Sequence, residues 1–153
     1  MEAAVLKARR EIGGLTPLSS DCGALCGSAC CRADEDGQGG VYLFPGEDKL
    51  LPGTDGGFAP LHTCEGACDR DRRPLGCRIF PLTPVKSASG WTVRIDRRAR
   101  AMCPLAECGL KGLNPAFVRA VARAIRTIAS EPEGEAFLQK WQALEDAFRS
   151  AEL

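Results

Sequence analysis

Cysteine is the residue type in this sequence with the clearest capacity for chemistry. Four of the nine cysteines fall within ten residues, as Cys22, Cys26, Cys30 and Cys31, with the spacing C-x3-C-x3-C-C. A group of thiolates this close in the chain suits Zn²⁺, Cu(I) or an iron–sulfur cluster. The residues between them are glycine, alanine, leucine and serine, and the small ones let the backbone wrap closely around a bound ion.

The other five cysteines lie downstream, and we expect them to return to the same site or sites. They are Cys64, Cys68, Cys77, Cys103 and Cys108. Nine thiols would supply two four-ligand sites with one thiol left over, or one site and a reactive pair. Because the side chains of adjacent residues diverge in extended backbone, Cys30 and Cys31 would each serve a different site. The sequence leaves the assignment open.

The charge balance and the absence of long apolar runs restrict the class of protein. Twenty basic and twenty acidic residues cancel, so no overall field attracts nucleic acid or an anionic membrane. No run approaches the roughly 18 apolar residues of a membrane span, and the N-terminus has no signal-peptide pattern. We therefore expect a cytoplasmic protein without nucleic-acid or membrane partners. In a reducing cytosol dense cysteines indicate metal or redox chemistry, and an odd number cannot all form disulfides within one chain.

The length of 153 residues is enough for one domain with its own core. We predict a small, irregular α+β domain, cysteine-rich and metal-binding, with a short β-hairpin and a C-terminal helical hairpin. Residues 1–20 would form an N-terminal helix and loop, residues 21–110 the cysteine-rich metal-binding core, and residues 113–151 the helical hairpin. Metal binding would supply much of the folding free energy of the loop-rich middle.

Local patterns predict the elements of the first two thirds of the chain. Spaced apolar residues favour a helix over residues 3–12 that ends at Gly13-Gly14. The apolar run 41–44 is typical of a buried strand. Residues 91–96 alternate apolar and polar side chains, and a turn-like segment before them predicts pairing with residues 78–85 as a hairpin.

The last third of the sequence has the periodicity of two amphipathic helices. Asn114-Pro115 is typical of an N-cap followed by proline at the first helical position. The segment 130–133 fits a capping box for the second helix. The predicted apolar stripes are Phe117, Val121, Ile125 and Ile128 in the first helix, and Phe137, Trp141, Leu144 and Phe148 in the second. This spacing indicates core packing rather than a cofactor platform.

Three cysteine-containing segments together resemble a known family. The cysteine run is followed by residues 73–81, R-P-L-G-C-R-I-F-P, and later by Cys103-Pro104. This order is similar to that of the CxxCxxCC (YkgJ-like) family of zinc- or iron-chelating cysteine-cluster proteins. The residues that would match its motifs are Cys22, Cys26, Cys30, Cys31, Cys77 and Cys103. The resemblance covers residues 21–108 and implies metal chelation, without implying a reaction or a substrate.

The chain would be a variant of that family. Its short spacings are three residues where the family has two, and Cys68 and Cys108 are additional. The absence of any C-x2-C pair weakens a zinc-ribbon interpretation, although four thiolates could still hold zinc. All-thiolate ligands among glycines, with a Cys-Pro step, favour an iron–sulfur cluster. We therefore expect an iron–sulfur cluster or zinc.

Two kinds of residue near the later cysteines could contribute to the site. His62, the only histidine, comes two residues before Cys64 and would reach the same ion, or it lies at the surface. Arg72, Arg73 and Arg78 flank Cys77. Their positive charge would lower a thiolate pKa or offset the charge of a thiolate site, or they form a solvated basic loop.

Three functions follow from these residues. The one we favour is a metal-binding protein in electron transfer or metal handling. The second is a structural zinc module whose helical hairpin binds a protein partner. The third is an enzyme that uses the cluster or a spare thiolate such as Cys68 or Cys108. The sequence contains no Ser-His-Asp set, P-loop or dinucleotide fingerprint, and one histidine limits acid–base chemistry, so enzymatic activity stays undecided.

Overall fold

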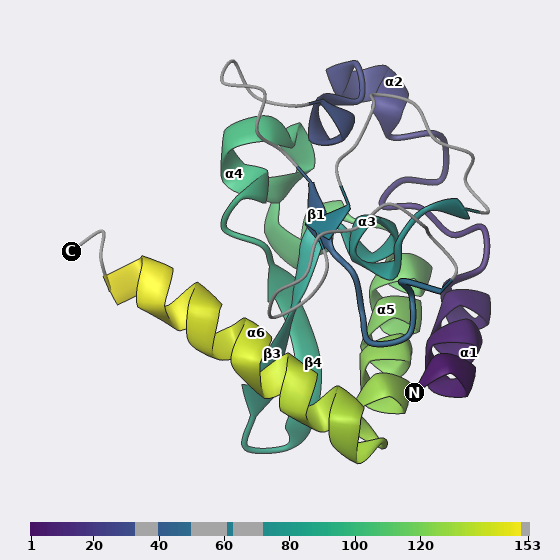
Figure 1. Cartoon of the computed structure of the whole chain (residues 1–153). Coiled ribbons are helices and arrows are strands. Elements are labelled where there is room, and N and C mark those ends of the chain that lie inside the picture. The colour runs from purple at the N-terminus through teal and green to yellow at the C-terminus, as the bar shows by residue number, and fades with distance from the viewer. Residues whose placement is uncertain (33–39, 50–60, 63–71, 151–153) are drawn as a thin grey trace.

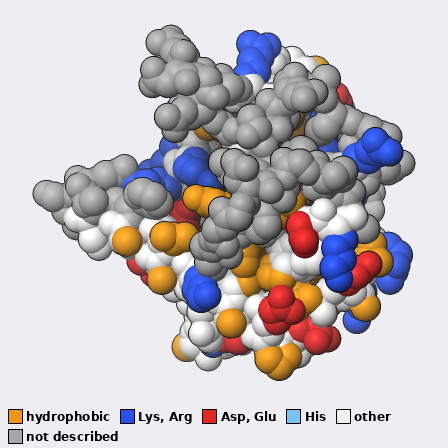
Figure 2. Space-filling model, in the orientation of Figure 1, with side chains coloured by type: hydrophobic (Ala, Val, Ile, Leu, Met, Phe, Trp, Pro, Cys, Tyr) orange, Lys and Arg blue, Asp and Glu red, His pale blue; other side chains and the backbone are white. Residues whose placement is uncertain are grey.

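A computed structural model of the chain describes residues 1–32, 40–49, 61–62 and 72–150 (Figure 1). The described elements combine helices with two short antiparallel strand pairs, so the predicted α+β class is confirmed. None of the described helices has the length and hydrophobicity of a membrane span. On the face shown in Figure 2, the described acidic and basic side chains are intermingled, in keeping with a net charge of zero.

The N-terminal helix α1 spans Glu2–Ile12, which confirms the predicted helix and adds one residue at its start. Ala4, Val5, Ala8 and Ile12 recur on one face and are buried. The helix ends because Gly13 adopts a φ of 54°, a left-handed conformation that glycine takes at little cost, and its N–H donates to the Arg9 carbonyl. The apolar face of α1 packs against helix α5, which lies beside it in Figure 1.

Helix α5 spans Pro115–Ala129 and begins at the predicted cap. The Asn114 side-chain oxygen accepts a hydrogen bond of 2.9 Å from the Ala116 N–H. The predicted stripe is confirmed, because all four of its apolar residues are buried. The Thr127 hydroxyl also links α5 to α1, because it donates a hydrogen bond of 3.0 Å to the Glu11 carboxylate.

The β-hairpin consists of β3, Leu82–Ser87, and β4, Gly90–Ile95, paired in antiparallel register from Leu82↔Ile95 to Ser87↔Gly90. The prediction of a strand over residues 78–85 is wrong for its first part. Residues Leu75–Ile79 form a short helix, α3, and β3 starts only after it. Leu75 and Ile79 are four residues apart, so both side chains point from one helix face into the core.

Helix α6 spans Pro132–Ser150 and turns away from α5 across the hairpin (Figure 1). Its Trp141 indole N–H donates to the buried Thr83 hydroxyl of β3 at 3.1 Å. The tight turn between α5 and α6 depends on Gly134, because a side chain there would overlap the Ile128 carbonyl. The two C-terminal helices are therefore present, but α6 packs on β3 as well as on α5.

Two details of the α6 prediction are wrong, and one lies outside the description. The Ser130 hydroxyl donates back to the Thr127 carbonyl at 2.8 Å, so it closes α5 rather than opening a capping box for α6. Leu144 is 40% exposed although it continues the apolar stripe. The side chain of Phe148 lies outside the described residues. Phe137 and Trp141 are buried as predicted.

The second strand pair is short. Strand β1, Val41–Tyr42, pairs antiparallel with β2, Leu61–His62. The predicted buried strand over residues 41–44 is only half correct, since Leu43 and Phe44 are buried but follow the strand. A side chain at Gly76 would overlap Val41, so the glycine lets β1 lie directly against α3.

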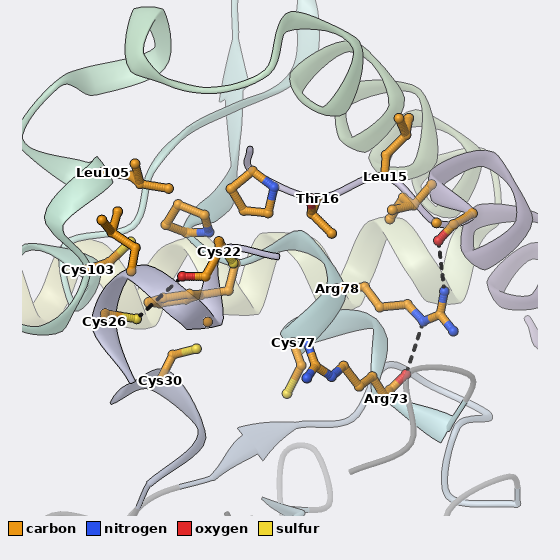
Figure 3. A pocket seen from close by; sticks show the side chains of 18 of the residues that line it. Leu15, Thr16, Cys22, Cys26, Cys30, Arg73, Cys77, Arg78, Cys103 and Leu105 are labelled. Atoms are coloured by element: carbon orange, nitrogen blue, oxygen red, sulfur yellow. Dashed lines mark hydrogen bonds between the residues drawn. The ribbon is translucent and has the colours of Figure 1, made fainter. Parts of the chain in front are cut away.

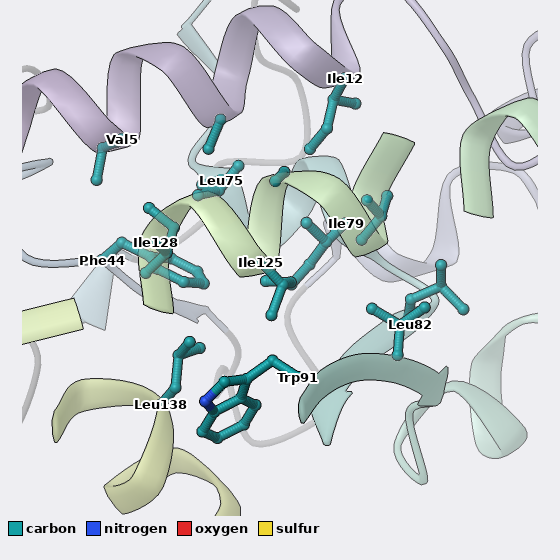
Figure 4. Close-up of a cluster of buried hydrophobic side chains, with 14 of the residues drawn as sticks. Val5, Ile12, Phe44, Leu75, Ile79, Leu82, Trp91, Ile125, Ile128 and Leu138 are labelled. Atoms are coloured by element: carbon teal, nitrogen blue, oxygen red, sulfur yellow. The ribbon is translucent and has the colours of Figure 1, made fainter. Parts of the chain in front are cut away.

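The hydrophobic core joins elements from both ends of the chain (Figure 4). Phe44 stacks near Phe137 and Trp141, with ring centroids 4.9 and 5.5 Å away. The other labelled core residues of Figure 4 are Val5, Ile12, Leu75, Ile79, Leu82, Trp91, Ile125, Ile128 and Leu138. Burial of this apolar surface is the main favourable contribution to folding.

A buried carboxylate connects the core to α3. Glu47 is fully buried and accepts hydrogen bonds from the Phe44 N–H at 3.0 Å, the Leu75 N–H at 2.8 Å and the Arg9 guanidinium at 3.0 Å. Arg9 also donates to the Arg73 carbonyl at 2.7 Å. Burial raises the pKa of Glu47 above its ordinary 4.5, and its hydrogen bonds to Leu75, Phe44 and Arg9 offset part of the rise. The start of α3 is thereby fixed relative to α1.

Candidate metal centre

The first cysteine run folds as two very short helices joined by left-handed backbone. Helix α2 spans Gly23–Cys26 and the 3₁₀ helix η1 spans Ala29–Cys31. Gly27 and Ser28 between them have φ angles of 59° and 58°. Left-handed backbone is uncommon for a residue other than glycine, so Ser28 is a conformational outlier at the centre of the cysteine run.

Local hydrogen bonds hold this turn. The Arg32 guanidinium donates to the Gly27 carbonyl at 2.5 Å, and the Ser28 N–H donates to the Gly23 carbonyl at 3.0 Å. The Cys26 thiol lies 3.9 Å from the Cys22 carbonyl oxygen. As a result, the three-residue spacings of the sequence become a compact curl rather than an extended segment.

Cys77 reaches the same region from α3. Its helix is anchored by the Glu47 carboxylate at Leu75 and by the buried side chains of Leu75 and Ile79. Cys77 itself is half-buried on the opposite part of the helix. This thiol is therefore carried by the rigid core rather than by a loop.

A third segment brings Cys103 to the site. Helix α4 spans Ala99–Met102, and the Cys103 N–H donates to the Ala99 carbonyl at 2.7 Å at its end. Pro104 then starts the 3₁₀ helix η3, Pro104–Ala106. Helix α4 also contacts η1, so the third cysteine segment lies beside the first.

Thiols from these three segments surround one cavity of about 540 Å³ (Figure 3). The cysteines that line it are Cys22, Cys26, Cys30, Cys77 and Cys103. They come from positions up to 81 residues apart in the chain, a separation that only tertiary folding closes. All five were predicted as metal ligands.

The remaining predicted ligands do not line this cavity or are not described. Cys31 is buried with its sulfur 4.0 Å from that of Cys30. Cys108 is exposed, just before the 3₁₀ helix η4, Gly109–Gly112, and is absent from the cavity wall. Cys64 and Cys68 lie outside the described residues. His62 is placed by its backbone in β2, and its side chain lies outside the description.

The predicted arginines separate into two groups. Arg73 and Arg78 line the cavity, whereas Arg72 is exposed and is absent from the wall. Arg78 donates to the Arg73 carbonyl and to the Gly13 carbonyl, both at 3.3 Å. These bonds hold its guanidinium between α1 and α3.

The described side chains are not arranged as a finished metal site. Across residues 1–32, 40–49 and 72–150, no group of three or more Cys, His, Asp or Glu side chains has the geometry to hold an ion. In Figure 3, Cys22, Cys26, Cys30 and Cys103 lie at one end of the cavity, and Cys77 lies nearer its middle. A bound ion would therefore require the flexible thiol side chains to turn inward.

The surroundings of Cys30 disfavour a charged thiolate at this residue. The residue is exposed overall, but partial removal of its sulfur from water raises the pKa of the Cys30 thiol from 9.0 to about 12, with further contributions from Cys31, Cys22 and Cys26. Negative charge on one thiol is thus unfavourable beside the others. A bound cation would remove this penalty.

Several lining residues had not been singled out from the sequence. They are mainly apolar and basic, and among them are Leu6, Arg9, Arg10, Leu15, Leu25, Met102 and Leu105. Leu25 is the one whose place in the cavity the sequence could have indicated, because it is an apolar residue inside the cysteine run. Arg10 and Met102 occupy ordinary helical positions, so no pattern distinguishes them.

Comparisons of the chain with protein-family models, with curated proteins and with solved structures found no match. The resemblance to the CxxCxxCC family therefore stays a prediction.

Proposed function

We propose that this chain binds a metal through the thiols around the cavity, as an iron–sulfur cluster or as iron or zinc ions. The observation that carries the proposal is the convergence of thiols from three distant segments, 22–30, 77 and 103, on one cavity. Soft thiolates are the ligands that zinc, copper(I) and iron–sulfur clusters prefer. Metal binding would release the thiol protons.

The conformation of the cysteine run supports this proposal. Ser28 adopts a left-handed backbone conformation. Apolar burial does not offset the free-energy cost of this conformation, since among residues 22–31 only Cys31 is buried. Unusual backbone of this kind is concentrated at functional sites. Closure of α2 and η1 around an ion would stabilise this unusual backbone.

The most suitable roles are electron transfer and metal handling. Cys30 is exposed, so a bound ion or cluster would lie close enough to the surface for exchange with a partner protein. Thiolates must stay reduced to bind metal, so we place the working protein in a reducing compartment, the cytoplasm.

Elemental analysis and a visible spectrum, on protein purified without oxygen, test the proposal. Stoichiometric iron with broad visible absorption would support an iron–sulfur cluster and a redox role. Stoichiometric zinc in a colourless sample would support zinc handling or a structural zinc module. Protein that binds neither metal under reducing conditions, with all thiols titratable, would overturn the proposal.

Single cysteine substitutions locate the site. We expect Cys26→Ser and Cys77→Ser each to lose most of the bound metal, because both thiols line the cavity. Cys108→Ser is the matched control and should keep the metal content and spectrum of the wild type, because Cys108 is exposed away from the wall. Equal losses in all three variants would contradict the assignment to this cavity.

A further inference from the structure

The cavity is larger than a metal site requires. Its volume of about 540 Å³ lies within the range of roughly 300–1,000 Å³ typical of pockets for small organic molecules. Ligands lie only about 2.0–2.3 Å from a zinc ion, so the ion would fill a small part of this space. In Figure 3 the cavity has a thiol end, with Cys26 and Cys103, and another end at Arg78 and Leu15.

The rim of the cavity is apolar and exposed. Leu6, Leu15, Leu25 and Met102 all line it, and each is at least 36% exposed. They account for four of the seven described large hydrophobic side chains with such exposure. Single exposed apolar residues are ordinary on a protein surface, but several around one cavity indicate a binding surface.

Among the described residues that line the cavity, all the charged ones are basic. Four arginines, Arg9, Arg10, Arg73 and Arg78, line it, and none of its described lining residues is acidic. The Arg9 guanidinium is paired with the buried Glu47 carboxylate, so its charge is already compensated. Arg10 is exposed in the last turn of α1, and Arg78 is held beside Gly13. A positive, concave surface attracts anions.

We propose that this cavity binds an amphipathic organic anion, with a carboxylate or phosphate head at Arg10 and Arg78 and an apolar body along Leu6, Leu15 and Leu25. Arginine suits both head groups because its guanidinium is always charged and donates charge-assisted hydrogen bonds to carboxylates and phosphates. The apolar body gains free energy by covering the exposed leucines. This inference goes beyond metal binding, since it uses the arginine end rather than the thiols.

Fluorescence displacement tests the ligand class. Anilinonaphthalene sulfonate, itself an amphipathic anion, should bind the full-length protein with enhanced emission. Decanoate or decyl phosphate should displace it, and the stronger competitor identifies the head group. Decanol and decyltrimethylammonium, with the same chain but no negative charge, should compete at least about tenfold more weakly, the loss expected for a charge-assisted hydrogen bond. Equal competition by decanol would overturn the proposal.

Charge-removing variants test the location. Arg10→Gln and Arg78→Gln should each weaken binding of the better anion by about tenfold. Arg123→Gln is the matched control, because it removes one exposed arginine from α5, outside the cavity. Circular dichroism confirms that each variant is folded. Equal weakening in all three variants, or none in Arg10→Gln and Arg78→Gln, would refute the site.

Metal content measured in the same samples separates the two proposals. If Arg10→Gln loses anion binding but keeps its full metal content, the result would support an anion site that is separate from the metal site. Wild-type protein that binds decanoate but no metal would refute the proposed function and support this inference. Metal-loaded wild-type protein that binds neither decanoate nor decyl phosphate would refute this inference alone.

Discussion

The helical core and the cysteine run of this protein are held together in different ways. Helices α1 and α5 bury continuous apolar faces, and the hairpin and α6 cover the remaining side of the core. Residues 22–31, in contrast, bury only Cys31 and keep their shape by local hydrogen bonds around Gly27 and Ser28. Apolar burial therefore holds the core, whereas local hydrogen bonds hold the cysteine run.

This difference explains how the two regions cooperate at one cavity. The core carries Cys77 and the arginines Arg9, Arg10 and Arg78 on packed helices. The cysteine run contributes Cys22, Cys26 and Cys30 from an element with few buried contacts. Regions with few apolar contacts open most easily, so a ligand has its largest effect on them.

The largest expected effect is the loss of a core side chain. Phe117 is fully buried in α5, so Phe117→Ala should lower the free energy of unfolding by about 3–5 kcal/mol. Leu25→Ala in the cysteine run should change it by less than about 0.5 kcal/mol, because Leu25 is exposed. Urea denaturation measures both. A comparable loss in Leu25→Ala would contradict the division into two regions.

The Glu47 carboxylate should be the most costly polar group to remove. Glu47→Ala leaves the Phe44 and Leu75 amides and the Arg9 guanidinium without this acceptor, so we expect a loss of about 3 kcal/mol. Glu47→Gln keeps the shape and one acceptor oxygen and should lose less. Because α3 carries Cys77, metal affinity should fall as well. Unchanged stability in Glu47→Ala would refute this role.

The same residue predicts a dependence on pH. Burial raises the pKa of Glu47 in the folded protein, so the folded state holds this proton more tightly than the unfolded chain does. The stability it contributes is therefore complete below the ordinary pKa of 4.5 and is lost as pH rises through the folded pKa. The stability of wild type relative to Glu47→Gln should fall over this window. If the stability of wild type relative to Glu47→Gln rises with pH instead, the pKa of Glu47 is not raised by folding.

Metal removal should act on the cysteine run alone. With a chelator, amide hydrogens of residues 23–31 should exchange at least about tenfold faster, which corresponds to roughly 1.4 kcal/mol of local stability. Amides of residues 117–128 in α5 should be unaffected. Hydrogen exchange with mass spectrometry measures both segments in one sample. Equal acceleration in α5 would mean that the metal stabilises the whole domain.

The smallest effect concerns the cap of α5. Asn114→Ala removes the acceptor for the Ala116 N–H and should cost about 1 kcal/mol of unfolding free energy. Ser130→Ala at the other end should cost less, since its hydroxyl donates only to the exposed end of the helix. Metal content should be unchanged in both variants. A loss of metal in Asn114→Ala would show that the two regions are coupled through α5.

Predictions from the sequence succeeded where the signal was local. Gly13 ends α1, Asn114 caps α5, and the alternation over residues 91–96 identifies β4. The predictions failed where contacts with residues distant in the sequence determine the local structure. Helix α3 has only five residues, too few for a periodic pattern, and is held by Glu47, 28 residues earlier. Leu144 continues the stripe of α6 but is exposed, while the next two residues, Glu145 and Asp146, pair with Arg98 and Arg94.

The sequence by itself determined the supply of thiols, their short spacings and the helices that build the core. Only the tertiary structure decided that Cys77 and Cys103 line the same cavity as Cys22, Cys26 and Cys30, while Cys108 does not line it. It also brought the arginines of α1 and α3 to that cavity. The physical reason is that local propensity depends on neighbouring residues, whereas a site depends on which distant apolar faces pack together and what they carry with them.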